Sequence, residues 1–547
     1  MPKIVLENVT KRWGKYYAVD NLNLVIEDNA FVTLLGPSGC GKTTTLRMIA
    51  GLETPTSGRI TIGDVTVYDS ELGINIPPNK RHVGFLFQNY ALWPNMTVYQ
   101  NISFGLKNVK EEMPTIDYKS KVNSTLLAIL RKADDVIRII NDCKSKQGTV
   151  DTNKAIIRLI DTFEISIYTA KILLGYKLHE GSNTASLVKQ ITDSITKELN
   201  SAKENHKAKG FMLNDNFELE KNGKVVTSIR KMTKEEIDLA VRRVSRIVKI
   251  GMYMDRYPSE LSGGQQQRVA IARTLAPEPS VLFMDEPLSN LDAKLRLEMR
   301  SELQRLHIDT GSTFVYVTHD QMEAMTLATK ICLIDNGVLN QYDRPLDVYN
   351  RPNNLFVADF VGNPVINFME ANGIQNPDGS IELSILEQMK ASFTPKDKIN
   401  YKQWIQTEEK EDELKHQKEL DRQKDKKSVE KGNNDIRFKY HIAKVDEFEV
   451  EEEKEVSYND FVLGIRPEFI KVSETGTLVG EVYSAMPTGM ETTLKLKVGN
   501  YLFTSVVFGG VLYEIGQMVK LEFSGNGIML FSRKNGKIIS LGSLKLK

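Results

Sequence analysis

A short glycine-rich stretch, residues 36–43, constrains the fold of this 547-residue chain more than any other feature. It reads GPSGCGKT, with four residues between its outer glycines and with lysine and threonine after them. The apolar run at residues 31–35 predicts a buried strand before it, and residues 44–50 predict the opening of a helix after it. A strand, this loop pattern and a helix, in that order, predict a phosphate-binding loop in an α/β fold. The alternative is a glycine-rich turn that binds nothing.

The residue types of this loop explain why phosphate would bind there. Glycines allow successive backbone N–H groups to turn toward one anion, and the helix that follows adds its own N–H groups and positive dipole end. Lys42 would add a charge at the β- and γ-phosphates, and the Thr43 hydroxyl would ligate Mg²⁺. The residues expected to contact a nucleotide here are Gly36, Ser38, Gly39, Cys40, Gly41, Lys42, Thr43 and Thr44.

Two carboxylates follow a second apolar run, residues 281–284. A fully buried parallel strand has this composition, and open α/β sheets place ligand-contacting groups at the carboxyl ends of such strands. Asp285 would hold Mg²⁺ directly or through water, and Glu286 would polarise the attacking water as general base. The alternative, an acidic pair on the surface, does not explain why a hydrophobic run leads straight into it.

Two further apolar runs end in the same way. Residues 83–87 lead into Gln88, which would reach Mg²⁺ or the attacking water. Residues 314–318 lead into His319, which would hydrogen-bond a γ-phosphate; taken alone, it would more often be a structural histidine.

A second anion-binding helix start and an aromatic turn complete the candidate site. Ser262 and the glycines after it, Gly264 among them, precede the helical pattern that begins near Gln265, so they would offer backbone N–H groups to an anion. Trp13 lies in an aromatic turn and is the candidate platform for a nucleotide base, with Tyr16 or Tyr17 as alternatives and core packing as the simpler interpretation.

Charge, hydropathy and cysteine content limit which cellular compartment and which binding partners we expect. The net charge is only +1, which favours neither nucleic acid nor an acidic substrate as partner. No apolar run approaches the roughly 18 residues of a membrane helix, and the first residues lack a signal-peptide core, so we expect a cytoplasmic protein. Three widely spaced cysteines argue against a disulfide framework. Cys40 would be reactive if its pKa were lowered, but a tolerated small side chain is the favoured interpretation.

Together these stretches resemble the nucleotide-binding subunits of ATP-binding cassette (ABC) transporters, over residues 1–107 and 233–370. The matching motifs, in family order, are the Walker A loop at 36–43, the Q-loop at Gln88, the LSGGQ signature at 261–265, Walker B at 281–286, the D-loop at 289–292 and the switch His319. Segments 87–94, 285–292, 318–326 and 360–364 resemble the maltose, multiple-sugar and glycerol-3-phosphate importer subunits, and residues 463–468 (LGIRPE) match the hallmark of their carboxy-terminal regulatory domain.

The resemblance implies a fold, ligands and partners. It implies a P-loop ABC ATPase domain with a helical subdomain, followed by an all-β regulatory domain of the OB/TOBE type. Two copies would clamp two ATP molecules with Mg²⁺, and Ser262 and Gly264 of one copy would act on the nucleotide of the other. Gln265 and Asp292 would also contact nucleotide. The subunit would lie peripherally on the cytoplasmic face of the membrane, against integral permease subunits, and an extracytoplasmic solute-binding protein would act indirectly.

The chain departs from the family pattern in two places. Residues 108–232 form a charged, partly helical stretch without a catalytic motif, which we interpret as an insertion in the helical-subdomain region rather than a functional domain. Residues of about 390–456 carry a mixed charge run that interrupts the regulatory domain and suggests a solvated helix or linker. The expected domains are therefore 1–107 with 233–362, the insertion 108–232, and 363–547.

One rival function comes from another class. A soluble cassette ATPase that acts on nucleic acid or ribosomes would use the lysine-rich insertion as its contact, but it would leave the regulatory-type tail unexplained. We therefore expect an ATPase that energises import of sugars or glycerol-3-phosphate-like solutes, without a nucleic-acid partner. A third, non-enzymatic alternative is that the tail also binds a regulator, which resembles some sugar-importer subunits and would add to transport rather than replace it.

Overall fold

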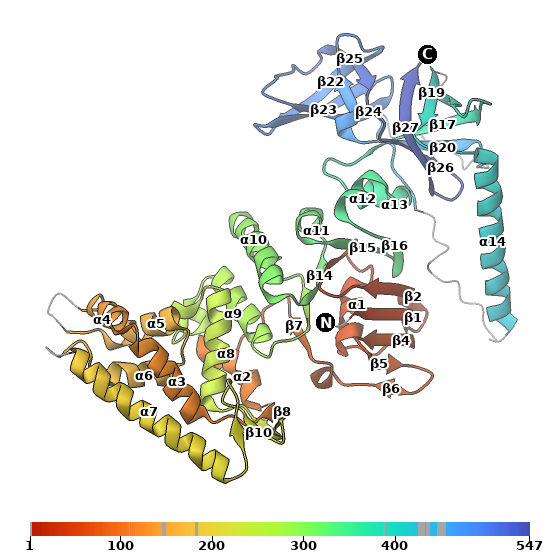
Figure 1. The fold of residues 1–547 in the computed structure, drawn as a ribbon. Helices are drawn as coiled ribbons and strands as arrows, with labels where there is room; N and C mark the ends of the chain where they lie inside the picture. Colours follow the sequence, from red (N-terminus) through yellow and green to blue (C-terminus); the bar gives the residue numbers. More distant parts are fainter. Residues whose placement is uncertain are drawn as a thin grey trace. The chain divides into compact units, whose positions relative to one another are not determined.

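The computed structural model describes residues 3–108, 110–144, 149–180, 184–386, 389–424, 433, 438–445 and 456–547. Part of the second charge run, residues 425–432, lies outside the described residues. The chain divides into two compact units, Met1–Arg81 with Thr313–Lys547, and His82–Ser312. Figure 1 labels their elements.

The first unit begins with an antiparallel sheet. Its strands are β1 (Ile4–Trp13), β2 (Tyr16–Ile26), β4 (Ser57–Ile62), β5 (Val65–Asp69) and β6 (Ile74–Asn75), in the order β2-β1-β4-β5-β6. Alternating apolar residues in β1 and β2 are buried, which is the pattern of strands with one face on a core. A turn at Gly63 and Asp64 joins β4 and β5.

A parallel core in the same unit carries the phosphate loop. β3 (Phe31–Leu35) pairs in parallel with β14 (Thr313–Thr318) and with β15 (Lys330–Asp335), and β16 (Val338–Asp343) pairs antiparallel with β15. Every residue of β3 and β14 is buried, which explains why both strands are mostly apolar rather than alternating. The helices α1 (Lys42–Ala50), α11 (Gln321–Leu327), α12 (Pro345–Asn350) and α13 (Leu355–Phe360) follow these strands.

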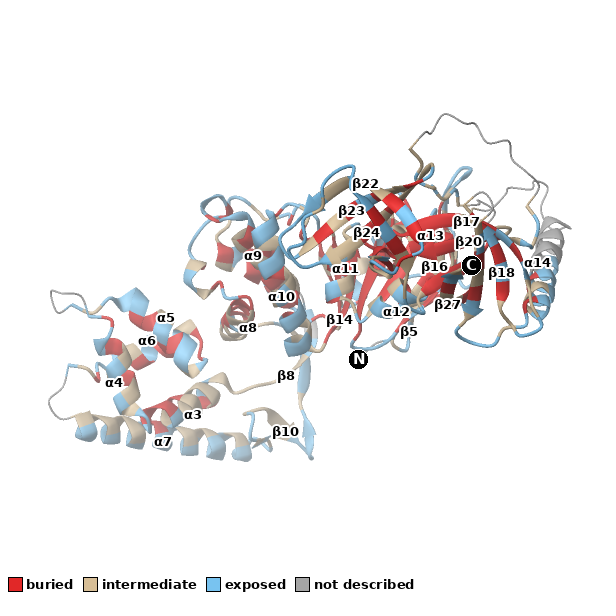
Figure 2. Ribbon diagram, turned by 90° about the horizontal axis from the view of Figure 1, so that it is seen from above, coloured by how far each residue is buried: buried red, intermediate tan, exposed pale blue. Residues whose placement is uncertain are grey.

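The carboxy-terminal part of the first unit is mainly β structure. A closed barrel runs in the order β17 (Asn367–Gln375), β18 (Ile381–Ile385), β19 (Met389–Pro395), β27 (Ile538–Leu546), β26 (Ile528–Ser532) and β20 (Asp460–Ile465). A five-stranded sheet follows in the order β21 (Ile470–Val472), β25 (Met518–Phe523), β22 (Leu478–Pro487), β23 (Glu491–Val498) and β24 (Tyr501–Phe508). Figure 2 shows buried residues along β17 and β20. The long helix α14 (Tyr401–Lys424) leaves the barrel after β19.

Arg466, in the LGIRPE stretch, fastens the barrel to the helices before it. Its guanidinium is fully buried and donates hydrogen bonds to the carbonyl oxygens of Ala358 (3.0 Å), Val361 and Tyr349 (2.9 Å). It also stacks on the Tyr349 ring, 4.1 Å from the ring centre. Burial lowers the pKa of Arg466 to about 10, so the side chain remains a cation at neutral pH.

The second unit holds a parallel strand pair and helices. β7 (Val83–Leu86) pairs with β13 (Val281–Asp285), and the helices are α2 (Val98–Asn108), α8 (Lys234–Ile247), α9 (Gly263–Leu275) and α10 (Ala293–Thr310). α8 begins after Thr233, because the Thr233 hydroxyl and the Glu236 carboxylate form a reciprocal capping box there.

The described part of the first insertion is a helical bundle. Its helices are α3 (Tyr118–Leu130), α4 (Ala133–Asn141), α5 (Thr152–Phe163), α6 (Ile167–Gly175) and α7 (Thr184–Ala208). They share one core of buried apolar side chains, among them Leu126, Ile160 and Leu173. The short strands β9 (Met212–Leu213), β10 (Leu219–Lys221) and β11 (Lys224–Val225) follow, and β8 (Lys110–Pro114) pairs with β12 (Thr227–Lys231) where the chain enters and leaves the insertion.

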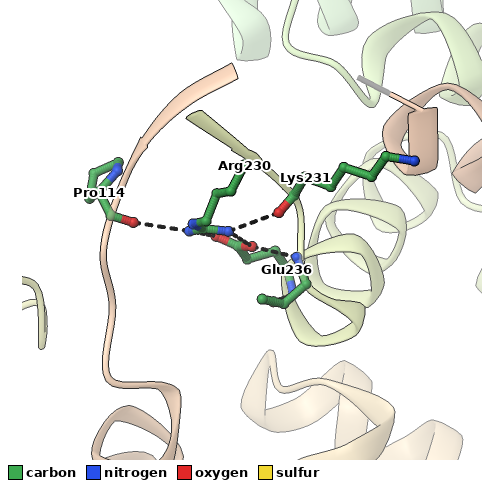
Figure 3. Close-up of polar contacts among 5 residues, drawn as sticks. Pro114, Arg230, Lys231 and Glu236 are labelled. Carbon is green, nitrogen blue, oxygen red and sulfur yellow. Dashed lines mark hydrogen bonds and ion pairs between the residues drawn. The ribbon is translucent and has the colours of Figure 1, made fainter. Parts of the chain in front are cut away.

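An ion pair closes this entry point, as Figure 3 shows. The Arg230 guanidinium donates to both carboxylate oxygens of Glu236 (2.7 and 2.8 Å) and to the Pro114 carbonyl (3.0 Å). Burial alone would raise the pKa of Glu236, but hydrogen bonds from Arg230, Tyr118 and the Thr233 N–H lower it to about 2. The ends of the insertion are therefore bound to the first turn of α8.

Candidate functional site

Close backbone approaches in the first unit require the glycines of the phosphate loop. Gly36 has a φ of 156°, and a Cβ added there would lie 2.0 Å from the Ile334 carbonyl oxygen. Gly41 has a φ of 99°, and its Cβ would lie 2.1 Å from the Ala18 carbonyl oxygen. Any side chain at either position would displace neighbouring backbone, so the loop can close only with glycine.

Lys42 lies inside this loop, at the first residue of α1. Its side chain is buried, and its ammonium donates to the carbonyl oxygens of Gly36 (2.9 Å) and Pro37 (2.7 Å). Cys40 is buried beside it; burial raises the pKa of the thiol, against the lowering effect of Lys42. A raised pKa reduces the thiolate fraction, which agrees with the favoured interpretation of Cys40 as a small loop side chain.

The aromatic turn lies against the phosphate loop. Trp13 and Tyr16 are both about half exposed and stack with parallel rings, 6.4 Å between centroids. The Tyr16 hydroxyl donates to the Gly39 carbonyl (3.1 Å), so the turn is bonded to the loop, while Tyr17 is partly buried. Trp13 therefore remains a candidate base platform, with the Lys11 ammonium 5.3 Å from its ring centre, and Tyr16 is exposed to a similar degree.

His319 directly follows β14, next to the phosphate loop. Thr318 pairs with Leu35 in the parallel register, so His319 and Gly36 leave neighbouring strands at the same edge. Sequence reasoning missed Glu323, a buried carboxylate that accepts hydrogen bonds from Tyr316 (2.7 Å) and Thr318 (2.8 Å) and thereby fixes this strand end. In the sequence, Glu323 is marked only as an acidic residue four positions after His319, and that spacing is too common to predict a role.

The second unit brings Gln88 and Glu286 together. The parallel register pairs Leu86 with Met284, so the residues after β7 and β13 emerge at one edge. The Gln88 amide donates to the Glu286 carboxylate (3.2 Å) and lies 3.5 Å from the Ser289 hydroxyl. Glu286 has a φ of 45°, which turns its side chain out of the direction of β13.

Asp285 is the last residue of β13, and Asp292 is the cap residue of α10, the helix that follows. Asp285 ends β13 and is buried, so the strand presents a carboxylate oxygen from its carboxyl end. Asp292 is exposed and caps α10 by accepting from the Leu295 N–H (3.0 Å). Carboxylate, hydroxyl and amide oxygens are ligands that Mg²⁺ prefers, so the residue types at Asp285, Thr43 and Gln88 fit that ion.

The signature stretch forms the start of α9. Ser262 caps this helix in a capping box with Gln265: its hydroxyl accepts from the Gln265 N–H, and the Gln265 amide oxygen accepts from the Ser262 N–H. Ser262 and Gly263 are exposed, whereas Gly264 is buried, and a Cβ on it would lie 2.7 Å from the Leu295 side chain. Gly264 thus permits close packing of α9 on α10.

Arg273 is a second residue that sequence reasoning missed. It lies on α9, and its guanidinium donates to the carbonyl oxygens of Tyr90 and Ala91 (2.7 Å each) and stacks on Trp93, 5.0 Å away. Arg273 therefore holds the segment after Gln88 to the signature helix. Arginine is common on helices, and its partners are about 180 residues away, so no local pattern marks it.

The structure gathers the predicted residues into two groups. In the first unit, Trp13 stacks on Tyr16, which is bonded to the phosphate loop, and His319 follows the strand next to the one that leads into the loop. The loop residues are Gly36, Ser38, Gly39, Cys40, Gly41, Lys42, Thr43 and Thr44. In the second, Gln88 and Glu286 meet beside Asp285, and Ser262, Gly264 and Gln265 begin the helix next to α10, which Asp292 caps. None of the described helices is long and apolar enough to span a bilayer.

Known proteins match this chain over most of its length. The family model of the ABC transporter domain matches residues 19–289. A trehalose/maltose import ATP-binding protein of Thermococcus litoralis is 35% identical over 70% of this chain and 70% of its own length. A spermidine/putrescine import ATP-binding protein of Ureaplasma parvum is 34% identical over 65% and 76%, and an osmoprotective compounds uptake ATP-binding protein of Synechocystis sp. is 33% identical over 70% and 71%.

A solved dimeric ATP-binding cassette with ADP and Pi also matches, at 22% identity over 62% of this chain and 98% of that chain. Its TM-score of 0.35 is too low to add to the assignment. The sequence relatives suffice, because the identity exceeds 30% over more than two thirds of their length. The expected α/β ATPase fold with a carboxy-terminal all-β domain is confirmed, and the chain belongs to the ABC transporter family, as an ATPase of the import type.

Proposed function

We propose that this chain energises import of sugars or glycerol-3-phosphate-like solutes by hydrolysing ATP on the cytoplasmic face of the membrane, against separate permease subunits. The pairing of Gln88 with Glu286 at the carboxyl end of β13 is the observation that carries the proposal, since it orients a candidate general base. Relatives named for trehalose and maltose import support a sugar, and relatives named for polyamines and osmoprotectants support the importer class.

The residues of the first unit would hold the nucleotide. The backbone N–H groups of residues 36–44 and the Lys42 ammonium bind the β- and γ-phosphates, Trp13 stacks on the base and His319 hydrogen-bonds the γ-phosphate. Lys42 exchanges its bonds to the loop carbonyls for bonds to phosphate oxygens. Thr43 of this unit, and Asp285 and Gln88 of the second, would supply oxygen ligands for Mg²⁺, which would neutralise charge on the phosphates.

The residues of the second unit would carry out hydrolysis. Glu286 accepts a proton from the attacking water, and the Gln88 amide holds the Glu286 carboxylate in place by the 3.2 Å hydrogen bond. Ser262, Gly264, Gln265 and Asp292 act on the nucleotide bound by a second copy of the chain, so the working unit is a homodimer. Closure of that dimer moves the permease subunits, and a solute-binding protein outside the membrane delivers the cargo.

Replacing Glu286 with glutamine tests this proposal. We expect ATP turnover to fall roughly 10²- to 10⁴-fold, the usual contribution of a positioned general base. Because glutamine keeps the side-chain shape, the variant should still bind ATP and form an ATP-dependent dimer, measured by light scattering after size-exclusion chromatography. Glu298→Gln on the exposed side of α10 is the matched control and should turn over normally. Survival of turnover in Glu286→Gln would exclude Glu286 as the base.

A further inference from the structure

Asn433 contacts the neighbourhood of the phosphate loop from a distant part of the sequence. It belongs to the stretch between about 390 and 456 in which the chain departs from the family pattern, and it lies in the same unit as the loop. Its side-chain amide donates to the carbonyl oxygens of Tyr17 (2.8 Å) and Asn336 (2.5 Å). Its backbone N–H donates to the Asp20 carboxylate (2.9 Å). One residue therefore joins the start of β2 to the turn between β15 and β16.

The two segments that Asn433 joins are the ones that enclose the carboxyl half of the phosphate loop. The Asp20 N–H donates to the Gly337 carbonyl, and the Gly337 N–H donates to the Cys40 carbonyl (2.9 Å each). The Ala18 carbonyl lies so close to Gly41 and to Gly337 that a Cβ on either glycine would lie 2.1 or 2.7 Å from it. Small shifts of residues 17–20 would therefore be transmitted directly to the loop.

The same strand start carries the aromatic turn. Tyr16 precedes Tyr17 in β2, stacks with Trp13 and donates to the Gly39 carbonyl. The carbonyl that Asn433 holds is thus one residue from the ring that is bonded to the phosphate loop. Loss of the Asn433 amide would loosen the turn and the loop relative to each other.

Residues 438–445 are anchored within the same unit. Phe438 packs edge-on against Phe356 of α13, 5.5 Å between ring centroids, and the Tyr440 hydroxyl donates to Glu370 of the barrel (2.8 Å). Farther along, the Val445 N–H donates to the Asn500 carbonyl beside β24 (2.9 Å). These contacts involve the barrel and the helices before it, and none of them includes Tyr17, Asp20 or Asn336.

We propose that Asn433 is a positioning residue for nucleotide binding: it fixes the Tyr17–Asp20 segment, and with it the Trp13–Tyr16 turn, against Cys40 and Gly41 of the phosphate loop. The inference rests on the proposed function, since it requires that this loop bind ATP. The second charged insertion thereby contributes a residue to the nucleotide site, acting through its neighbours rather than by touching the nucleotide.

The chemistry of the amide predicts how substitutions rank. Asn433→Ala removes two hydrogen bonds to backbone carbonyls, and Asn433→Ser retains one donor. Asn433→Asp is nearly isosteric, but its carboxylate would face the two carbonyl oxygens of Tyr17 and Asn336, so it repels the groups that the amide attracts. ATP affinity should therefore decrease from wild type through the serine and alanine variants to the aspartate variant.

The experiment measures ATP dissociation constants, kcat, KM and nucleotide-free melting temperatures of the full-length variants. The loss of one or two neutral hydrogen bonds corresponds to a roughly three- to tenfold weaker ATP affinity for Asn433→Ala. We expect KM to rise with kcat nearly unchanged, since Asn433 contacts neither Glu286 nor Gln88. Tyr440→Phe is the matched control: it removes one hydrogen bond from the barrel end of the same segment and should bind ATP like wild type.

The outcomes separate this inference from the proposed function. If wild type binds no ATP, the proposed function itself fails. If wild type binds ATP and Asn433→Ala and Asn433→Asp bind it equally well, Asn433 does not position the site. A melting temperature that falls in step with affinity, or an equal loss in Tyr440→Phe, would show that the segment only stabilises the fold and would also overturn the inference. Should the alanine variant fail to fold, Asn433→Ser carries the same test.

Discussion

The phosphate loop and the inserted helical bundle depend on their sequences in opposite ways. In the loop, Gly41 is required because backbone lies 2.1 Å from where a Cβ would be. In the bundle, Leu173 is one of many apolar side chains in a shared core, and another apolar residue of similar volume would serve there. The loop depends on exact backbone geometry, while the bundle depends on apolar volume. Damage to one should therefore leave the other intact, which can be tested from both sides.

The largest effect is expected in the bundle. Leu173 on α6 is fully buried, so Leu173→Ala should cost about 3 kcal/mol of the free energy of unfolding of helices α3–α7, by lost burial and the cavity that remains. Hydrogen exchange of the backbone amides of these helices measures that loss, and ATP binding should not change. Ile172→Ala, one residue away and 43% exposed, is the control and should have little effect. Weaker ATP binding in Leu173→Ala alone would show that the bundle core supports the nucleotide site.

The converse change is Gly41→Ala. A methyl group here must displace the Ala18 carbonyl or the loop, and such a displacement should weaken ATP binding roughly a hundredfold, about 2.7 kcal/mol. Isothermal titration of ATP measures the loss, and exchange protection of the bundle should match wild type. Gly105→Ala in α2, where an added Cβ meets nothing within 4 Å, is the control. Unchanged ATP affinity in Gly41→Ala would mean that the loop adapts and that its glycines are not required.

A region could be predicted from the sequence when its interacting residues lie close together along the chain. The caps at Ser262 and Thr233 involve partners three residues away, so their helix starts were predictable. The phosphate loop and the polar ends of β13 and β14 were predictable because strand, loop and helix follow one another directly. The bundle was predicted only as scattered helical patterns. Asn433 and Arg273 could not be found, and the partners of Arg466 could not be predicted although its LGIRPE motif was recognised. Each of these side chains bonds a backbone carbonyl over 100 residues away, and no spacing rule links such partners.

The junction between the bundle and the rest of its unit depends on exact polar contacts, as the phosphate loop does, although the bundle itself depends on apolar volume. The start of α6 is bonded to α8: the Ile167 N–H donates to Asp238 (2.6 Å), and the Thr169 hydroxyl donates to Glu235 (3.1 Å). The Arg230–Glu236 pair closes the other side (Figure 3). The Arg230–Glu236 pair depends on the charge of Glu236, so this side of the junction is expected to respond to pH, whereas the hydrophobic core of the bundle is not.

The smallest predicted effect comes from titration of Glu236. Its pKa is about 2 in the folded chain, against 4.5 without partners, so its contribution to stability is complete above pH 4.5 and is lost as the pH falls toward 2. With allowance for partial exposure, that contribution is about 2 kcal/mol. Glu236→Gln removes the charge, so its free energy of unfolding should change less with pH in this range.

Urea unfolding of the second unit at pH 5.5 and pH 3.5 measures this difference. Wild type should lose more stability between the two pH values than Glu236→Gln. Glu204→Gln, on the exposed face of α7, is the control and should behave like wild type. An equal acid response in wild type and Glu236→Gln would mean that the Arg230–Glu236 pair does not stabilise the junction, and that the contacts of α6 with Asp238 and Glu235 join the bundle to α8 without it.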